Sequence, residues 1–238
     1  VLRNTELGPA EKSRMRQAVR LAALFHDVGH APLSHTSEST MPSASTLKLP
    51  SWLFARTQGK DHQATHEHYT LGILLASSLA DEMRKTLDST GLTPESIASL
   101  IAGIPTPGAS PFMARGINYH PLLSQIVSGE LDADRMDYLL RDSFYTGVAY
   151  GKYDLGWLLE NMTNVVVDGA AYLALNKRAI FTFEDFLLSR YHMFLAVYYH
   201  YTSTGFDHML LSYYRDEQGA YELPSDFEIY LTRDDTHL

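Results

Sequence analysis

The chain has 238 residues, of which 45% are hydrophobic and 20% are charged. This length and balance are typical of one globular domain with a sizeable core. We therefore expect a single domain over residues 1–238. The chain begins at Val1 without an initiator methionine and ends within the charged stretch TRDDTHL, so we also expect a fragment that is truncated at both ends.

The formal net charge of −9 argues against a broad nucleic-acid surface, because such a surface needs clustered lysines and arginines. A small phosphorylated ligand stays possible, since a bound cation and a few local arginines can neutralise it. The chain has no cysteine, which excludes disulfides and thiolate metal ligands. No stretch reaches the roughly 18 apolar residues of a membrane span, and no signal-peptide pattern opens the chain. We expect a cytoplasmic protein with no membrane partner.

Residues 10–28 carry apolar side chains at helical spacing, and a glycine and a proline follow closely. This pattern predicts a helix whose last turn contains His26 and Asp27. It places His30 and His35 on the loop that follows.

Residues 39–61 are rich in Ser, Thr, Pro and Gly, which predicts a long loop of a kind that often acts as a lid. A Pro- and Gly-rich break covers residues 103–111. Helical patterns extend over residues 66–87 and over residues 121–143, the second with an interruption at Gly129. Another helix is predicted to begin after the N-cap residue Thr93.

Residues 165–175 predict a β-hairpin that turns at Asp168-Gly169, since this dipeptide between two β-rich runs is a strong hairpin signal. A further helical pattern covers residues 182–214, and no internal repeat is visible. The predicted fold is mainly α, a helical bundle with one small β-hairpin.

Two separate segments carry side chains suited to metal binding and proton transfer. The string LFHDVGHAPLSHTSE at 24–38 places His26 beside Asp27, and GELDADRMDYLLRDS at 129–143 supplies several aspartates. An imidazole and a neighbouring carboxylate can both reach a metal ion beyond a helix end, and an Asp from a distant helix is a common further ligand. A single histidine is more often structural, but this clustering favours a hydrolase.

The second string also predicts a polar stripe on one helix face, because Asp134, Tyr138, Arg141 and Asp142 follow at i, i+4, i+7 and i+8. Burial of such a stripe is costly unless each group has a partner. The stripe therefore faces either solvent or a polar cavity, and the His26-Asp27 pair favours the cavity.

At these residues the chain resembles the HD-domain phosphohydrolases, in particular the deoxynucleoside triphosphate triphosphohydrolase branch that is like the SAM-and-HD-domain proteins. The resemblance extends from about Leu21 to about His208. It depends on four blocks in the same order as in that family: LFHDVGHAPLSHTSE, THE at 65–67, LDADRMDYLLRDS and FLLSRYHMFLAVYYH.

The resemblance implies one divalent metal ion bound by two histidines and two aspartates, and Mg, Mn, Fe, Ni and Zn are all compatible. His26, Asp27 and Asp134 match three of these ligands. The fourth, a histidine some forty residues upstream of the HD pair in the family, has no counterpart because the chain begins later. Without that ligand we expect reduced metal affinity and activity.

The resemblance also implies an acid–base cluster beside the metal, and we assign the proton transfer to His35 with Glu38. A histidine with a pKa near 6.5 can exchange a proton at neutral pH, and a carboxylate can orient it. The cluster comprises His30, His35, Glu38, His66 and Glu67.

For the substrate, the resemblance implies that Arg135 and Arg190 bind phosphate, while Tyr138, Tyr198 and Asp142 contact the sugar. A tyrosine beneath the sugar would leave little room for a 2′-hydroxyl. Tyrosines at helical spacing more often form a core stripe, whereas Arg190, within an apolar helix, is expected to have an anionic partner.

The sequence therefore predicts a metal-dependent hydrolase that converts a deoxynucleoside triphosphate into a deoxynucleoside and triphosphate. Two alternatives stay open. One is a nucleotide phosphatase or phosphodiesterase of the HD superfamily, and the other is a nucleotide-sensing module with impaired catalysis. A homo-oligomer is the expected assembly.

Overall fold

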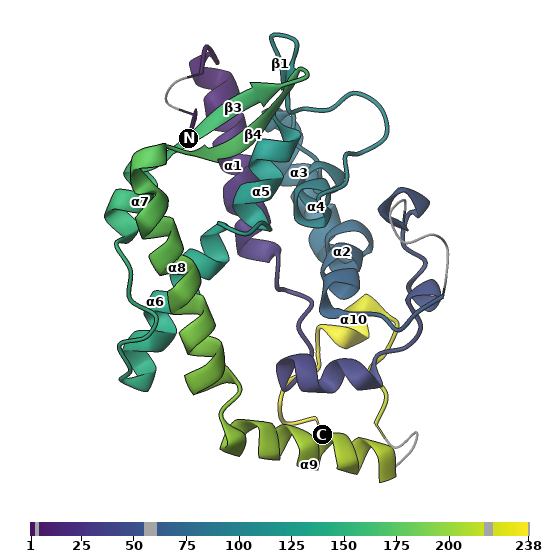
Figure 1. Cartoon of the computed structure of the whole chain (residues 1–238). Coiled ribbons are helices and arrows are strands. Elements are labelled where there is room, and N and C mark those ends of the chain that lie inside the picture. The colour runs from purple at the N-terminus through teal and green to yellow at the C-terminus, as the bar shows by residue number, and fades with distance from the viewer. Residues whose placement is uncertain (3–4, 55–60, 217–220, 238) are drawn as a thin grey trace. The chain divides into compact units, whose positions relative to one another are not determined.

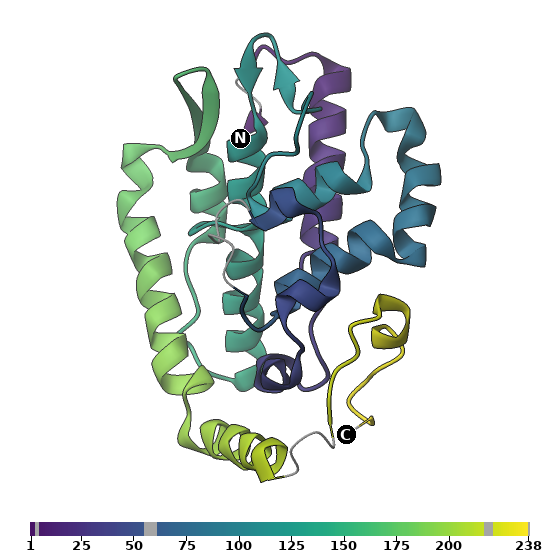
Figure 2. The same cartoon turned by 90° about the vertical axis from the view of Figure 1, so that its right-hand side faces the viewer.

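The computed structural model describes residues 1–2, 5–54, 61–216 and 221–237 (Figures 1 and 2). Its chain divides into two compact units. Unit 1 comprises Val1–Arg16 and Phe112–Thr204, and unit 2 comprises Gln17–Pro111 and Gly205–Leu238. The expectation of one domain over the whole chain stays a prediction.

Unit 1 contains a four-stranded sheet in the order β1-β2-β4-β3. The predicted hairpin is confirmed, because Asp168 and Gly169 both have positive φ (49° and 74°) and connect the two longest strands. A second, shorter hairpin was not predicted, since two-residue strands leave no alternating pattern in the sequence. The strands are β1 (Met113–Ala114), β2 (Ile117–Asn118), β3 (Met162–Val167) and β4 (Ala170–Leu175).

The helices of unit 1 pack on a core in which Leu139, Leu158, Phe186 and Met193 are fully buried. The predicted interruption near Gly129 is confirmed, and Asp132 then caps the next helix by accepting the backbone N–H of Arg135 at 2.7 Å. These helices are the start of α1 (Pro9–Phe25), α5 (His120–Val127), α6 (Ala133–Thr146), α7 (Leu155–Asn161) and α8 (Ile180–Met193).

The helical pattern predicted over 182–214 is divided in the structure. A π-helical turn, Phe194–Tyr198, follows α8, and the backbone changes direction before α9 (Tyr201–Asp216) begins. Helical spacing of apolar residues does not distinguish a continuous helix from one with such a break, because both bury similar residues.

Unit 2 contains the rest of α1 and the part of α9 from Gly205 on. It also contains α2 (His66–Ala76), α3 (Ser78–Leu87), α4 (Pro94–Ala102) and α10 (Phe227–Tyr230). The prediction of one helix over 66–87 is wrong at Ser77. Ser77 is extended, with φ −105° and ψ 174°, and its hydroxyl accepts the N–H of Leu79. The helix after Thr93 is confirmed, since the Thr93 hydroxyl caps it.

The predicted loop at 39–61 has no long helix or strand in its described part. It contains short 3₁₀ turns at Ala44–Leu47 and Ser51–Phe54, and another 3₁₀ turn at Ser34–Thr40 precedes it. The portion 55–60 lies outside the described residues.

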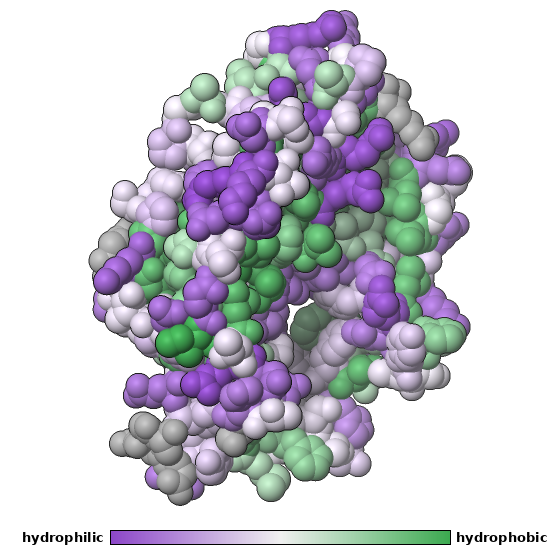
Figure 3. Space-filling view, turned by 180° about the vertical axis from the view of Figure 1, so that it is seen from behind, coloured by the Kyte–Doolittle hydropathy of each residue, from purple (hydrophilic) through white to green (hydrophobic). Residues whose placement is uncertain are grey.

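Among the described residues, no helix combines the length and the apolar composition needed to cross a bilayer. On the face drawn in Figure 3, hydrophobic and hydrophilic side chains form intermixed patches.

Candidate functional site

The first candidate residues lie in the turn that follows α1. The helix ends at Phe25, so the prediction that His26 and Asp27 occupy its last turn is wrong by one to two residues. The backbone forms two tight turns here. The N–H of Val28 donates to the carbonyl of Phe25, and the N–H of His30 donates to the carbonyl of Asp27, both at 3.1 Å. The turn projects His26 and Asp27 just beyond the helix end.

Gly29 allows this turn to lie directly against α2. A Cβ atom at Gly29 would be 2.2 Å from the backbone nitrogen of Thr70 and 2.4 Å from the carbonyl oxygen of His66. The Thr70 hydroxyl accepts the Gly29 N–H at 3.0 Å and donates to the carbonyl of His26 at 2.9 Å. Tyr230 donates its hydroxyl to the Gly29 carbonyl at 2.7 Å, within the buried part of unit 2. The turn is thus fixed from both sides.

His26 and Asp27 present a nitrogen and an oxygen donor side by side. His26 Nδ1 lies 2.9 Å from the Ala23 carbonyl, so it carries the proton and donates it there. This bond leaves Nε2 as the acceptor, and Nε2 lies 3.3 Å from an Asp27 oxygen. A ring nitrogen fixed by a backbone carbonyl is the usual arrangement of a metal-binding histidine. These donors could hold a divalent ion.

Asp27 also faces His30, whose Nε2 lies 3.6 Å from the other carboxylate oxygen. The interaction with His30 is the largest influence on the pKa of Asp27 and lowers it, against the opposing effect of burial, with smaller contributions from His26 and His66. Asp27 is therefore a stable anion at neutral pH, as a metal ligand must be.

His30, His35 and His66 form a compact group. The His30 and His66 rings stack at 4.1 Å between centroids, and His35 meets them edge-on at 4.8 and 5.0 Å. One nitrogen from each ring lies within 4.8 Å of the others, so these three residues could also hold a metal ion.

Glu38 is the shared partner of two of these histidines. One of its oxygens accepts hydrogen bonds from Nδ1 of His35, at 3.2 Å, and from Nδ1 of His66. Burial alone would raise the pKa of Glu38, but the hydrogen bonds from His66 and His35 outweigh burial and lower it. The contact between His35 and Glu38, chosen from the sequence, is present.

Glu67 does not join this group. His66 is the first residue of α2, and its ring contacts Glu38. Glu67, the next residue of the helix, is exposed. Among the described residues, the groups that could hold a metal ion do not include Glu67. Its predicted acid–base role therefore has no contact in support.

In unit 1, the predicted sugar-contacting residues are adjacent. Tyr198 donates its hydroxyl to Asp142 at 2.6 Å, and its ring lies 6.0 Å from that of Tyr138. Burial raises the pKa values of both tyrosines. Asp134, half-buried in the first turn of α6, lies one helical turn before Tyr138.

Arg141 pairs with an exposed neighbour on the helix and not with the other residues of the polar stripe. It forms a two-pronged pair with Asp137, at 2.9 and 3.1 Å, and both side chains are about 60% exposed. The solvent interpretation therefore applies to Arg141, while Tyr138 and Asp142 face Tyr198.

The two predicted phosphate-binding arginines share one carboxylate. Nη1 of Arg190 lies 3.4 Å from Glu130, and Nη1 of Arg135 lies 3.8 Å from the same oxygen. The anionic partner expected for Arg190 is thus present. Nε of Arg190 is buried and has no hydrogen-bond partner among the described residues.

Sequence reasoning missed Thr70, Tyr230 and Glu130. Thr70 and Tyr230 are ordinary helix residues in the sequence, and only their positions in the fold bring them to the turn after α1. Glu130 lies one residue outside the LDADRMDYLLRDS block, and its proximity to an arginine 60 residues later has no local signal.

No protein-family model matches the chain. The chain is 30% identical over 185 residues to an uncharacterized protein of Bacillus subtilis, covering 78% of this chain and 34% of that protein. It is 29% identical over 198 residues to an uncharacterized protein of Mycoplasma pneumoniae, covering 83% and 40% respectively. It is also 26% identical over 197 residues to the deoxynucleoside triphosphate triphosphohydrolase SAMHD1 homolog of Dictyostelium discoideum, covering 83% and 33%. The chain thus spans about a third to two fifths of the length of the curated relatives it matches.

Proposed function

We propose that this chain is the hydrolytic part of an HD-type, metal-dependent phosphohydrolase that converts deoxynucleoside triphosphates into deoxynucleosides and triphosphate. The observation that carries the proposal is the turn after α1, where a histidine–aspartate pair lies beside a carboxylate-linked histidine cluster. Similarity to a protein named as a deoxynucleoside triphosphate triphosphohydrolase homolog supports it.

The metal ligands in this proposal are His26, Asp27 and, from α6, Asp134. The donors are nitrogen and oxygen atoms, which suit Mn, Fe, Ni or Zn and, less well, Mg. A bound divalent ion would polarise a phosphoryl oxygen and lower the pKa of a bound water molecule.

The acid–base role belongs to His35 with Glu38. Glu38 accepts the Nδ1 proton of His35 and so leaves Nε2 to exchange a proton with the substrate. The side chain of His35 is 69% exposed, whereas that of His66 is 17% exposed. His35 can therefore reach a ligand, while His66 fixes Glu38 from the inner side.

In the proposed reaction, the oxygen of one water molecule bonds to the α-phosphorus and the bond from that phosphorus to the 5′-oxygen breaks. His35 donates a proton to the departing 5′-oxygen, and the proton released by the water replaces it. The net result is one water consumed per triphosphate released.

The substrate-binding role belongs to the unit 1 cluster. Arg135 and Arg190 offer guanidinium groups to the phosphate tail, and such groups match phosphate oxygens in pairs. The hydrogen bond from Tyr198 to Asp142 fixes a flat aromatic surface beside Tyr138 for the sugar. Two arginines suit the long phosphate tail of a triphosphate. The proposal therefore favours a deoxynucleoside triphosphate over a nucleoside monophosphate or a cyclic nucleotide.

The test is product analysis after the full-length protein is incubated with each deoxynucleoside triphosphate and a divalent metal. Triphosphate and free deoxynucleoside are the expected products. Inorganic phosphate alone would select the phosphatase alternative instead, and binding without turnover would select the sensor.

An Asp134→Ala variant should lose turnover and keep its fold, as judged by circular dichroism. The matched control is Asp137→Ala on the same helix, because Asp137 is exposed and contacts only the surface residue Arg141 in the hydrogen bonds and ion pairs described above. Full activity in Asp134→Ala would remove this residue from the proposed site.

A further inference from the structure

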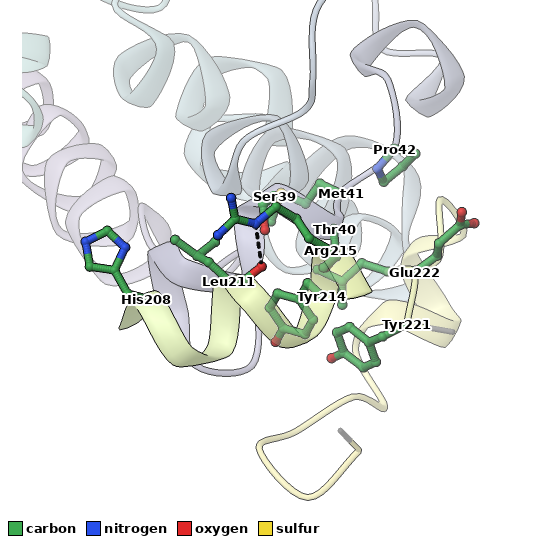
Figure 4. A pocket seen from close by; sticks show the side chains of 11 residues that line it. Ser39, Thr40, Met41, Pro42, His208, Leu211, Tyr214, Arg215, Tyr221 and Glu222 are labelled. Carbon is green, nitrogen blue, oxygen red and sulfur yellow. Dashed lines mark hydrogen bonds between the residues drawn. The ribbon is translucent and has the colours of Figure 1, made fainter. Parts of the chain in front are cut away.

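A pocket of about 670 Å³ in unit 2 is separate from the residues assigned so far. It lies between the end of the Ser34–Thr40 turn, the C-terminal half of α9 and the segment 221–223 (Figure 4). This volume is within the range of pockets that hold small organic molecules, about 300–1,000 Å³.

Arg215 gives the pocket a positive end. Its Nε donates to the Leu211 carbonyl of its own helix at 3.2 Å. No carboxylate of the described residues lies within ion-pair distance of its guanidinium group. Ser39 and Glu222 line the same pocket, and in Figure 4 the carboxylate of Glu222 lies well away from this group. A guanidinium can bind a carboxylate or phosphate group through paired hydrogen bonds.

Two tyrosines give the pocket a flat aromatic wall. The rings of Tyr214 and Tyr221 stack at 5.4 Å between centroids, with only 10° between their planes. The Tyr221 hydroxyl is buried and has no hydrogen-bond partner among the described residues. A planar ring packs well against such a surface, and a ligand atom or a water molecule could satisfy the hydroxyl.

We infer that this pocket binds a small molecule that carries a planar ring and an anionic group, either a carboxylate or a phosphate. The anionic group lies at Arg215 and the ring lies along the tyrosine wall. A donor group on the ring would face Glu222. This binding does not depend on the proposed hydrolase activity.

The pocket is lined in part by the end of the turn that carries the proposed acid–base residues. The Ser34–Thr40 turn that carries His35 and Glu38 is bound to α9 by Thr36, which donates to Asp207 at 2.8 Å, and by Ser37, which pairs with Tyr214 at 2.8 Å. The backbone N–H of Leu223 also donates to Thr40 at 3.1 Å. A ligand that joins these three segments should therefore reduce opening of the turn.

Calorimetric titration of the full-length protein with benzoate and with deoxyadenosine monophosphate tests the site and separates the carboxylate from the phosphate source. At least one probe should bind, and Arg215→Gln should weaken it tenfold or more. Leu211→Trp, which keeps the charge but fills the space, should also abolish binding. Arg190→Gln, in the proposed substrate cluster, should leave this binding unchanged.

Failure of both probes to bind at millimolar concentration would overturn the inference, as would unchanged binding in Arg215→Gln or Leu211→Trp. Loss of binding in Arg190→Gln alone would place the ligand in the substrate cluster, which also contradicts the inference. Hydrogen exchange of the backbone amides of residues 34–40 should slow on addition of the probe, and an unchanged rate would refute the coupling to this turn.

Discussion

Replacement of Gly29 by alanine is a direct test of how the turn after α1 is positioned. The new Cβ would lie 2.2 Å from the Thr70 nitrogen and 2.4 Å from the His66 oxygen. Both are backbone atoms of the first turns of α2, so a side-chain rotation cannot relieve the overlap. Carbon contacts are normally about 3.5 Å or longer, so the turn would have to move by more than about 1 Å.

The cost has two parts. Overpacking of this kind destabilises a protein by about 1–3 kcal/mol. The displacement also breaks the two hydrogen bonds of the Thr70 hydroxyl with this turn, each with a net contribution of about 1 kcal/mol. We expect a total loss of about 3–5 kcal/mol in the free energy of unfolding, or roughly 6–20 °C in Tm for a chain of this size.

The assays are urea denaturation and metal content by elemental analysis, because loss of the Thr70 bond to the His26 carbonyl should also change the orientation of the proposed ligands in this turn. Gly205→Ala on α9 is the matched control. A Cβ there would meet no atom within 4 Å, so the change should be neutral or stabilise the helix by up to about 1 kcal/mol. If Gly29→Ala stays within about 1 kcal/mol of the wild type and binds the same amount of metal, the steric reasoning is refuted.

Three further predictions concern single side chains. Tyr230→Phe removes the hydroxyl that donates to the Gly29 carbonyl. Urea denaturation should show a loss of about 1–3 kcal/mol in the free energy of unfolding, because a buried carbonyl is left unpaired. No loss would mean that water replaces the hydroxyl. Glu38→Gln should destabilise the protein at neutral pH. Because folding lowers the pKa of Glu38 below its ordinary value of 4.5, the difference from wild type should shrink as the pH falls below that value, and a pH-independent difference would contradict this cause. Glu130→Gln removes the carboxylate that competes with phosphate for Arg190. Calorimetry should show inorganic triphosphate binding up to about fivefold tighter, since an exposed ion pair contributes at most about 1 kcal/mol. Weaker binding would show that Glu130 positions the arginines instead.

Local signals predicted much of the fold. The hairpin at Asp168-Gly169 and the helix capped by Thr93 depend on a few neighbouring residues, so their sequences are sufficient. The break at Ser77 and the π-helical turn after α8 were not predictable in this way, because the apolar spacing continues through both.

The candidate site likewise combines local contacts, which the sequence predicts, with contacts between distant residues, which it does not. The contact between His35 and Glu38 spans three residues and follows from the sequence, whereas the bond from His66 to Glu38 joins residues 28 apart and needs the fold. Glu67 was assigned to the cluster from the family resemblance, and it stays a prediction, because adjacent residues on a helix point in different directions and Glu67 is exposed beside His66.

The hydrogen bond from Tyr230 to Gly29 joins residues that are 201 positions apart. During synthesis, Tyr230, which secures the histidine turn from the other side, is added 201 residues after Gly29. The turn can therefore gain this hydrogen bond only after the segment that carries Tyr230 has emerged from the ribosome. Until then, the turn in a nascent chain lacks this support, so stable metal binding at the proposed site should follow the synthesis of Tyr230.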